Sequence, residues 1–259
     1  MIKMKIIDFH QHYCLPTEDI LAINKKYNIL NSVQIPLNFG NLRWIDIVKE
    51  GYLKSVQYKD EILNRLNDFN KVIYQMINPI KDFIFTPWIS AKSDYQSFYN
   101  EEWYKNCKIV KFIPILDEFT EDYYLNLENM ISKIENKIIM IHTGWGSKVS
   151  NLLKIIKNNK NKIFVLAHMK EDFDFYNSDR KKALYYENVY LEISYMSTPK
   201  RIRQYAELGY LDRILFGSDF RTFEDEITLK WYIYGIHSLG LSRSERDKIF
   251  YYNAYDLIF

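Results

Sequence analysis

Residues 5–12 read KIIDFHQH, a short apolar run that ends in two histidines. Runs rich in Ile and Phe are typical of a strand that is buried on both faces, as in a parallel sheet. His10 and His12 are two residues apart, and side chains along a strand repeat with a period of two, so both imidazoles point to the same side. The stretch therefore predicts a buried strand that presents two nitrogen ligands together.

Seven further runs of this kind follow, at residues 29–36, 83–91, 108–115, 137–144, 162–169, 189–195 and 213–220. Segments with helical spacing, such as residues 121–135 and 148–159, lie between most of them. Eight strand–helix units in 259 residues match the size of an eight-stranded α/β barrel, which is about 250 residues. We therefore predict an α/β fold, a (β/α)8 TIM barrel, as a single domain over residues 1–259.

Two parts of the chain lie outside this repeat. Residues 37–58 are ambiguous and are compatible with a loop and a helix over the barrel mouth. Ser242 and Glu245 form the pattern Ser-x-x-Glu, a capping box that predicts a C-terminal helix to about Leu257.

Charge and composition exclude several classes of protein. Thirty-five Lys and Arg residues against 33 Asp and Glu give a net charge of +2, which argues against nucleic acid or an anionic membrane as the main partner. No stretch approaches the roughly 20 apolar residues of a membrane span, and the N-terminal apolar run is too short and polar for a signal peptide. The two cysteines, Cys14 and Cys107, are expected to be reduced thiols, which predicts a cytoplasmic protein.

The positions of the histidines indicate where the chemistry lies. Four of the five close predicted strands: His10, His12, His142 and His168. The carboxyl ends of the strands form the active-site face of such a barrel. His142 would supply a third nitrogen from the fifth strand, and Asp219 in ILFGSDF would supply a carboxylate beside the first strand. Three imidazoles and one carboxylate with an open position suit Zn²⁺ or a similar divalent ion.

With these motifs the sequence resembles the amidohydrolase superfamily, in the amidohydrolase-related branch that includes small decarboxylases and lactone or amide hydrolases. The resemblance rests on DFHQH at residues 8–12, Lys111, His142, His168, NVYLEIS at residues 188–194, GSD at residues 217–219, and Asn253 with Ala254. It spans residues 8 to 254, which is nearly the whole chain. The combination is specific, although each motif alone is weak.

The resemblance implies roles at the matching positions. His10, His12, His142 and Asp219 would bind one divalent metal, Zn²⁺ first, with Mn²⁺ or Fe²⁺ as alternatives. His168 would lie near the activated water and the substrate. Asp219 is the natural general base, and His168 could orient the water or stabilise an oxyanion. Asp8 either supports the metal ligands or makes a hydrogen bond at the bottom of the barrel.

Other residues are candidates for contact with the substrate. Lys111 either bridges two metals as a carboxylated lysine, as in the dinuclear relatives, or pairs with a carboxylate or an anionic substrate. Trp88 and Trp145 follow the third and fifth strands and could wall a pocket, although aromatic packing is an open alternative. Arg221, just beyond Asp219, could hold a substrate carboxylate or form a surface ion pair. Glu192 and Ser194 share one face of the seventh strand, and whether that face is the barrel interior is left open.

The resulting prediction is a metal-dependent hydrolase that attacks the amide, ester or lactone carbonyl of a small molecule. The alternative with the same ligand set is a decarboxylase of a small unsaturated or aromatic acid. A barrel that has lost catalysis and serves as a binding module is the third hypothesis. The expected partner is a small-molecule substrate, with no nucleic acid and no membrane, and a homo-oligomer is left open.

Overall fold

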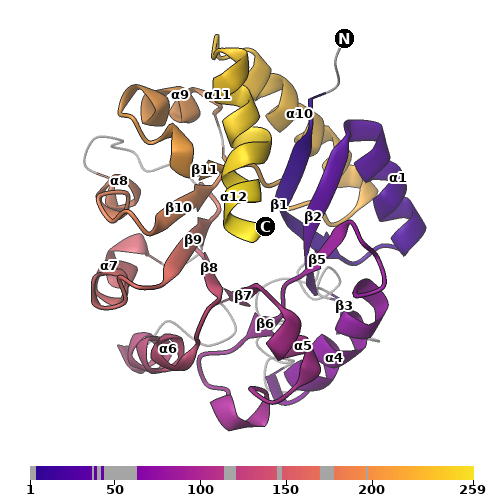
Figure 1. Cartoon of the computed structure of the whole chain (residues 1–259), viewed down its shortest axis with the longest axis vertical. Coiled ribbons are helices and arrows are strands. Elements are labelled where there is room, and N and C mark those ends of the chain that lie inside the picture. Colours follow the sequence, from indigo (N-terminus) through magenta and orange to yellow (C-terminus); the bar gives the residue numbers. More distant parts are fainter. Residues whose placement is uncertain are drawn as a thin grey trace.

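Eight parallel strand positions form a ring with helices around its outside (Figure 1). The computed structural model describes residues 4–36, 38–39, 42–43, 63–113, 121–144, 148–169, 178–196 and 198–259. The strands of the ring are β1 (Ile6–Tyr13), β2 (Ile29–Pro36), β5 (Phe83–Phe85), β6 (Trp88–Ile89), β7 (Ile109–Phe112), β8 (Ile138–His142), β9 (Ile163–Ala167), β10 (Val189–Glu192) and β11 (Ile214–Leu215). Every predicted strand is therefore present, including the second and the third, which polar residues and proline interrupt.

Two junctions close the ring. One sheet has the order β1-β2-β5 and the other the order β11-β10-β9-β8-β7-β6. Only Thr86 and Pro87 separate β5 from β6, so these two segments are one interrupted strand. On the other side, the Phe9 amide donates to the Phe216 carbonyl (2.8 Å) and the His12 amide to the Phe220 carbonyl (2.9 Å). These bonds join the first strand to the last, and the predicted TIM barrel is confirmed.

The helices cover the outside of the ring and one of its ends. Those outside are α1 (Thr17–Tyr27), α4 (Leu66–Ile77), α5 (Glu102–Asn106), α6 (Glu121–Lys133), α7 (Val149–Asn158), α8 (Asp179–Ala183), α9 (Lys200–Glu207) and α10 (Glu226–His237). The chain then runs through α11 (Arg243–Asp247), a π-helical turn (Lys248–Tyr252) and α12 (Asn253–Ile258). Ser242 and Glu245 make both bonds of the predicted capping box. In Figure 1 α12 lies across the middle of the ring.

Residues 37–58 are only partly described. Within them β3 (Asn38–Phe39) and β4 (Leu42–Arg43) pair as a short antiparallel hairpin. The predicted helix of this region falls outside the described residues.

Buried side chains alternate between two hydrophobic clusters along the strands. In β8, Ile139 and Ile141 belong to the cluster that packs against the outer helices, whereas Ile138 and Met140 belong to a second cluster that includes Ala254 and Ile258 of α12. A period of two is expected when one face of a strand meets helices and the other fills the barrel. The second cluster therefore fills the barrel interior, and α12 covers one end of it.

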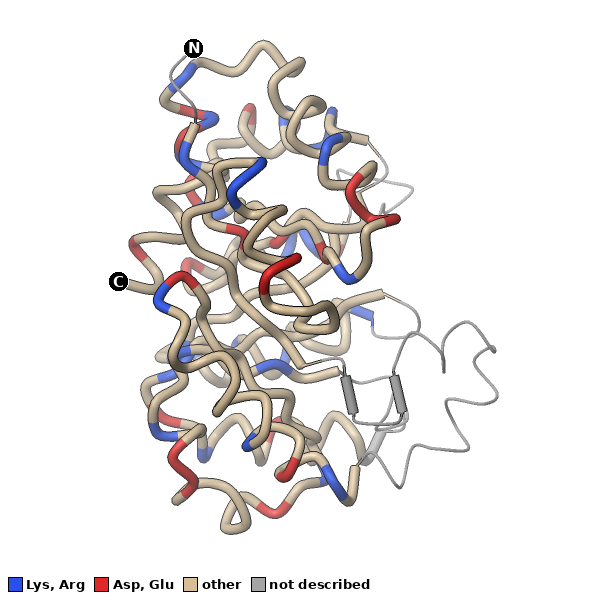
Figure 2. The backbone as a smooth tube through the Cα atoms, turned by 90° about the vertical axis from the view of Figure 1, so that its right-hand side faces the viewer, with Lys and Arg blue, Asp and Glu red and all other residues tan. Residues whose placement is uncertain are grey.

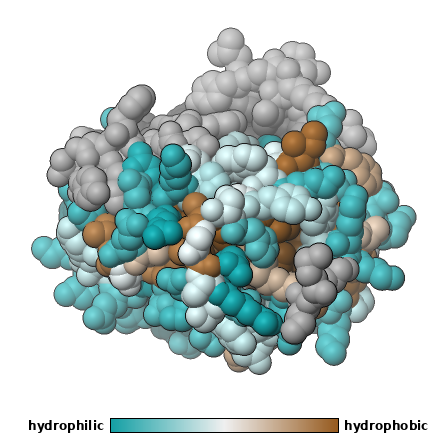
Figure 3. Space-filling view, turned by 90° about the horizontal axis from the view of Figure 1, so that it is seen from above, coloured by the Kyte–Doolittle hydropathy of each residue, from teal (hydrophilic) through white to brown (hydrophobic). Residues whose placement is uncertain are grey.

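Charge and hydropathy are mixed over the part of the chain that the figures colour. Acidic and basic residues are interspersed along the described chain (Figure 2). The face seen from above is mostly hydrophilic, with separate hydrophobic patches between polar side chains (Figure 3). Among the described residues, no helix has the length and apolar character that crossing a bilayer requires.

Candidate metal centre

Three potential ligand atoms from opposite ends of the sequence converge inside the barrel. The Nε2 atoms of His10 and His12 lie 3.2 Å apart, and Asp219 Oδ1 lies 3.0 Å from the first and 2.9 Å from the second. All three residues are buried. Atoms about 3 Å apart share a point at about 2 Å from each of them, which is the usual bond length from Zn²⁺ to nitrogen or oxygen. This group can therefore hold one metal ion.

An irregularity in β1 places the two histidines on the interior face. Asp8 pairs with Ser32 of β2 and Gln11 pairs with Gln34, so three steps along β1 oppose two steps along β2. Such a bulge re-aims the residues that follow it. The Gln11 amide then bonds Asn24 of α1, while its neighbours His10 and His12 face Asp219.

Asp8 fastens the strand that carries the histidines to the segment that carries Asp219. Its carboxylate accepts from the backbone amides of His10 (3.1 Å) and Ser218 (2.9 Å) and from the Ser218 hydroxyl (2.6 Å). Burial raises the pKa of Asp8 to about 7. Among the described contacts, Asp8 therefore bonds two backbone amides and the Ser218 hydroxyl, and none of these bonds involves an imidazole ring.

The backbone at Asp219 is held in an uncommon conformation. Asp219 has φ of 54°, and its amide donates to the His10 carbonyl at 2.7 Å. The left-handed region is uncommon for residues other than glycine and clusters at functional sites. The bond across the closing strands keeps the carboxylate at this position beside the two rings.

The charge states of His12 and Asp219 suit metal binding. Burial lowers the pKa of His12 to about 3, so this ring is neutral at ordinary pH. Burial also raises the pKa of Asp219, but the His10 charge and the hydrogen bonds of both histidines outweigh it and hold that pKa well below its usual range. For His10, burial and Lys111 lower the pKa while Glu192 and Asp219 raise it, and the net result is an increase. A neutral ring and an ionised carboxylate are the forms that bind metals, so a metal ion at His10 would have to displace any proton on its Nε2.

Lys111 reaches the same group from β7. Its Nζ lies 2.5 Å from His10 Nε2, and the side chain is fully buried. Burial lowers the pKa of Lys111 to about 8. Only one cation, the ammonium group or a metal ion, can use the His10 Nε2 lone pair at a time. The structure thus places Lys111 within the cluster rather than at an open pocket wall.

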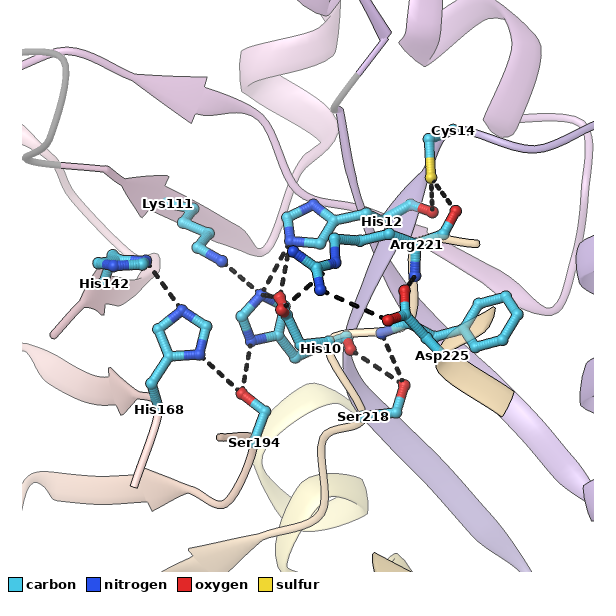
Figure 4. A network of polar contacts seen from close by, with 12 residues as sticks. His10, His12, Cys14, Lys111, His142, His168, Ser194, Ser218, Arg221 and Asp225 are labelled. Atoms are coloured by element: carbon cyan, nitrogen blue, oxygen red, sulfur yellow. Dashed lines mark hydrogen bonds and ion pairs between the residues drawn. The ribbon is translucent and has the colours of Figure 1, made fainter. Parts of the chain in front are cut away.

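His142 and His168 form a second pair beside this group (Figure 4). His168 Nε2 lies 2.8 Å from His142 Nδ1, and His168 Nδ1 lies 2.8 Å from Ser194 Oγ. Burial lowers the pKa of His142 to about 3 and that of His168 well below its usual value, so both rings are neutral. The group of ligand atoms that lie within 4.8 Å of one another around Asp219 comes from His10, His12 and Asp219, and His142 is not part of it. Its role as a metal ligand stays a prediction.

The predicted substrate residues differ in their positions. Trp88 is 1% exposed and its backbone bonds Asn70, so it packs inside and lines no open surface. Trp145 falls outside the described residues. Arg221 is partly exposed, with its Nε 3.8 Å from Asp219 Oδ2 and a hydrogen bond to Asp225.

Tyr195 joins the site without having been predicted from the sequence. It has φ of 56°, its ring edge lies against His168 with centroids 5.0 Å apart, and the Arg221 guanidinium lies 5.8 Å from its ring centroid. Burial and a hydrogen bond with Asp219 raise its pKa to about 12. The only signal in the sequence is its place directly after the seventh strand.

Comparisons with known proteins agree with this architecture. The profile of the amidohydrolase family matches residues 117–259, and a search of curated proteins finds no match. A probable 2-pyrone-4,6-dicarboxylic acid hydrolase from Acinetobacter baumannii, solved with citric acid, has a TM-score of 0.57 at 15% identity over 98% of this chain and 99% of that chain.

Two decarboxylases are also similar in structure. The 2,6-dihydroxybenzoate decarboxylase from Rhizobium has a TM-score of 0.63 at 10% identity over 98% of both chains. A dihydroxybenzoic acid decarboxylase from a Polaromonas species, solved with manganese and the inhibitor 2-nitroresorcinol, has a TM-score of 0.63 at 13% identity over 98% of this chain and 96% of that chain. At these identities the structures support the fold, and the family profile supports the relationship.

Proposed function

Because the chain belongs to the amidohydrolase family, we propose that it is a metal-dependent hydrolase that opens the amide, ester or lactone bond of a small molecule. One observation carries the proposal: His10 Nε2, His12 Nε2 and Asp219 Oδ1 lie about 3 Å from one another at the carboxyl ends of two adjacent strands. The carboxyl ends of the strands are where barrel enzymes hold their active sites.

We assign the residues as follows. His10, His12 and Asp219 would hold the ion, with His142 as a further ligand. When bound, such an ion lowers the pKa of a water molecule towards 7 and polarises a carbonyl group. Asp219 accepts the proton of the attacking water, because its carboxylate is ionised at neutral pH. His168, neutral and buried beside Tyr195, orients the water or the developing oxyanion.

The charges around the site favour a substrate that carries a carboxylate. Arg221 is the partly exposed cation next to Asp219, and a guanidinium group recognises carboxylates through paired hydrogen bonds. Burial lowers the pKa of Arg221, but the nearby Asp219 and Tyr195 raise it by more. The pKa is therefore raised overall, and Arg221 stays charged. Lys111 contributes a second positive group deeper in the barrel.

The identity of the metal and the setting of the protein are also proposals. Two imidazoles and one carboxylate suit Zn²⁺, and Mn²⁺ or Fe²⁺ are compatible with the same atoms. Cys14 and Cys107 are both free thiols, which supports the reducing cytoplasm as the compartment. The mixed surface charge supports a small-molecule substrate over nucleic acid or membrane, and a homo-oligomer stays an expectation.

The direct test is turnover by the metal-loaded protein. We expect protein loaded with Zn²⁺, Mn²⁺ or Fe²⁺ to hydrolyse members of a panel of small lactones, esters and amides that carry a carboxylate. His10→Ala and Asp219→Ala should abolish turnover while circular dichroism shows a folded barrel. Unchanged turnover in either variant would remove that residue from the mechanism.

A decarboxylase is the second candidate, because the structures similar to this chain include decarboxylases and Arg221 could equally hold an aromatic acid. The same preparation is therefore assayed for CO₂ release from aromatic and unsaturated acids. Gas release without hydrolysis would replace the first proposal with the second. A folded protein that takes up none of the three metals would favour a binding module.

A further inference from the structure

Glu192 lies between the two groups of histidines and contacts both. Its Oε2 lies 2.7 Å from His10 Nδ1 and 2.8 Å from Ser194 Oγ, which in turn lies 2.8 Å from His168 Nδ1. Glu192, His10 and Ser194 are completely buried. Among the described ion pairs, the partner of Glu192 is His10.

Both oxygens of Glu192 act as acceptors. The backbone amide of Ser194 donates to Oε1 at 2.5 Å, and the backbone amide of His168 donates to Oε2 at 3.3 Å. A backbone amide can only donate, and an ionised carboxylate can only accept. The bond from His10 Nδ1 to Oε2 therefore requires that His10 carries a proton on Nδ1. When the ring is neutral, as metal binding requires, its lone pair is then on Nε2, towards His12 and Asp219.

Glu192 Oε2 also determines which atoms carry protons along a second chain of contacts, which runs through Ser194 and His168 to His142. We call this chain the His168 arm, and the direct contact with His10 the His10 arm. Ser194 has one hydroxyl proton, and it must go to Glu192 Oε2, since two acceptors at 2.8 Å would otherwise repel. Ser194 Oγ then accepts, so His168 carries its proton on Nδ1. A neutral His168 presents a lone pair on Nε2, which accepts from Nδ1 of His142. The Nε2 atom of His142 is thereby also left with its lone pair.

We propose that Glu192 is a positioning residue that sets the ring tautomers of His10, His168 and His142 at once. Its oxygen Oε2 fixes a proton on Nδ1 of His10 directly, and on Nδ1 of His168 and His142 through Ser194. The lone pairs of the neutral His10 and His142 rings are then on Nε2. That these lone pairs bind a catalytic metal ion rests on the proposed function. The tautomers themselves are independent of turnover.

The fold reserves space for this carboxylate. A Cβ atom at Gly217 would lie 2.2 Å from Glu192 Oε1 and 2.5 Å from its Cδ. Gly217 follows the last strand, directly before the Ser218–Asp219 pair. A larger residue at 217 would therefore displace the Glu192 carboxylate from His10 and from Ser194.

The test measures ring protons directly. Long-range ¹H–¹⁵N spectra of protein labelled with ¹⁵N-histidine separate protonated from unprotonated ring nitrogens. We expect His10 to carry a proton on Nδ1 in both the metal-free and the Zn²⁺-loaded protein. We expect His142 and His168 to carry theirs on Nδ1 in the metal-free protein.

Two variants distinguish the contact of Glu192 with His10 from its contact with His168 through Ser194. Glu192→Gln keeps the size of the side chain, but its NH₂ group must face a donor at either oxygen position. We expect the ring protons of His10 and His168 to move and the affinity for Zn²⁺, measured against a chelator, to fall about 10- to 100-fold. Ser194→Ala removes the 2.8 Å bond to His168 and a long 3.5 Å contact of Ser194 Oγ with His10 Nδ1. His10 Nδ1 keeps its 2.7 Å bond to Glu192, so the signals of His168 and His142 should move more than that of His10.

Three results would overturn the proposal. They are a wild-type His10 that is protonated on Nε2 alone, a wild-type His168 without a proton on Nδ1, and a folded Glu192→Gln variant with wild-type tautomers and a Zn²⁺ affinity within about two-fold. The wild-type spectra decide the matter even where the variant does not fold. A protein with the expected spectra that turns over no substrate would contradict the proposed function and leave the positioning role standing.

Discussion

Asp219 is the residue at which most of the site's interactions meet. One oxygen lies near both histidines of β1, and the other lies 3.8 Å from Arg221. The phenol of Tyr195 also bonds this carboxylate. Tyr195 and Asp219 both adopt a positive φ, so two strained positions bring their side chains together at the carboxyl ends of neighbouring strands.

Arg221 is the partly exposed cation beside Asp219. Replacing Arg221 by Gln removes the positive charge beside Asp219, and charge-assisted hydrogen bonds are worth about 1.5–3 kcal/mol. We expect KM for the carboxylate substrate found in the assays to rise about 10- to 100-fold, with a smaller change in kcat. Arg243→Gln, on the exposed end of α11, is the matched control and should leave KM unchanged. An unchanged KM in Arg221→Gln, with metal content equal to wild type, would rule out substrate binding by Arg221.

Among the elements, β10 and the segment after β11 depend on each other's side chains. Glu192 ends β10, and Gly217 leaves the space that its carboxylate occupies. A side chain at position 217 would move Glu192, and through Glu192 it would affect His10 of β1, which is far away in the sequence. This coupling makes the short last strand part of the site although its two residues are apolar.

Substitution of Gly217 by Ala tests this dependence. We expect a loss of about 1–3 kcal/mol in the free energy of unfolding from overpacking, together with weaker Zn²⁺ binding. Gly209→Ala is the control, because Gly209 has φ of +80° and no atom within 4 Å of an added Cβ. Its cost is backbone strain of about 1 kcal/mol, with unchanged metal affinity. Chelator competition and urea denaturation measure both quantities, and equal metal affinities in the two variants would contradict the coupling.

Helices α1 and α10 are linked by one carboxylate. Glu226 accepts from Lys26 Nζ at 2.6 Å and from the Tyr27 hydroxyl. The hydrogen bonds from Lys26 and Tyr27 lower the pKa of Glu226 to about 2, from its usual 4.5. A lowered carboxyl pKa stabilises the fold above the unfolded value, and this stabilisation is lost as the pH falls towards the folded value.

Glu226→Gln should therefore lower the free energy of unfolding by up to about 1 kcal/mol at pH 7, as for an ion pair at a surface. The difference from wild type should shrink as the pH falls from 4.5 towards 2. Urea denaturation over a pH series measures it, with Glu207→Gln in the exposed pair with Arg203 as a control. A difference that stays constant down to pH 3 would contradict the role of this carboxylate.

For the whole molecule, closure of the barrel and assembly of the site are one event. The bonds of Asp8 to Ser218 join the first strand to the last segment, and they lie directly beside His10 and Asp219. The ligand atoms come from residues 10, 12 and 219, so they meet only when the ring is complete. Metal binding should accordingly stabilise the closed barrel, because the unfolded chain has no such site.

Ser218→Ala tests the closure. It removes a hydroxyl that donates to the buried Asp8 carboxylate at 2.6 Å. An unsatisfied buried group costs about 1–3 kcal/mol, and we expect a loss of that size in the free energy of unfolding. Ser132→Ala, an exposed serine that bonds within its own helix, should change the stability by less than about 0.5 kcal/mol. Equal stabilities of the two variants would count against this role for Ser218.

The barrel could be predicted because its signals are local. The short apolar runs, the segments with helical spacing between them and the histidines at the ends of the runs need only neighbouring residues to be recognised. The meeting of His10, His12 and Asp219 followed from the neighbourhood of the first and last strands in a closed ring.

The rest depends on geometry that no local pattern records. The bulge in β1 lies between Asp8 and Gln11 and is defined by the register with β2, and the partner of Asp8, Ser218, is 210 residues away in the sequence. Positive φ values at His168, Tyr195 and Asp219 are set by bonds between segments distant in the sequence. The depth of Trp88 and the contact of Lys111 with His10 follow from the barrel radius and the side-chain rotamers, which a strand pattern does not specify.

Anomalous diffraction from crystals of the protein loaded with Zn²⁺ would locate the metal ion directly. We expect a single strong peak in the anomalous difference map at about 2 Å from His10 Nε2, His12 Nε2 and Asp219 Oδ1. A peak at another place, or full loading of the protein with no peak among these three atoms, would contradict the proposed metal centre.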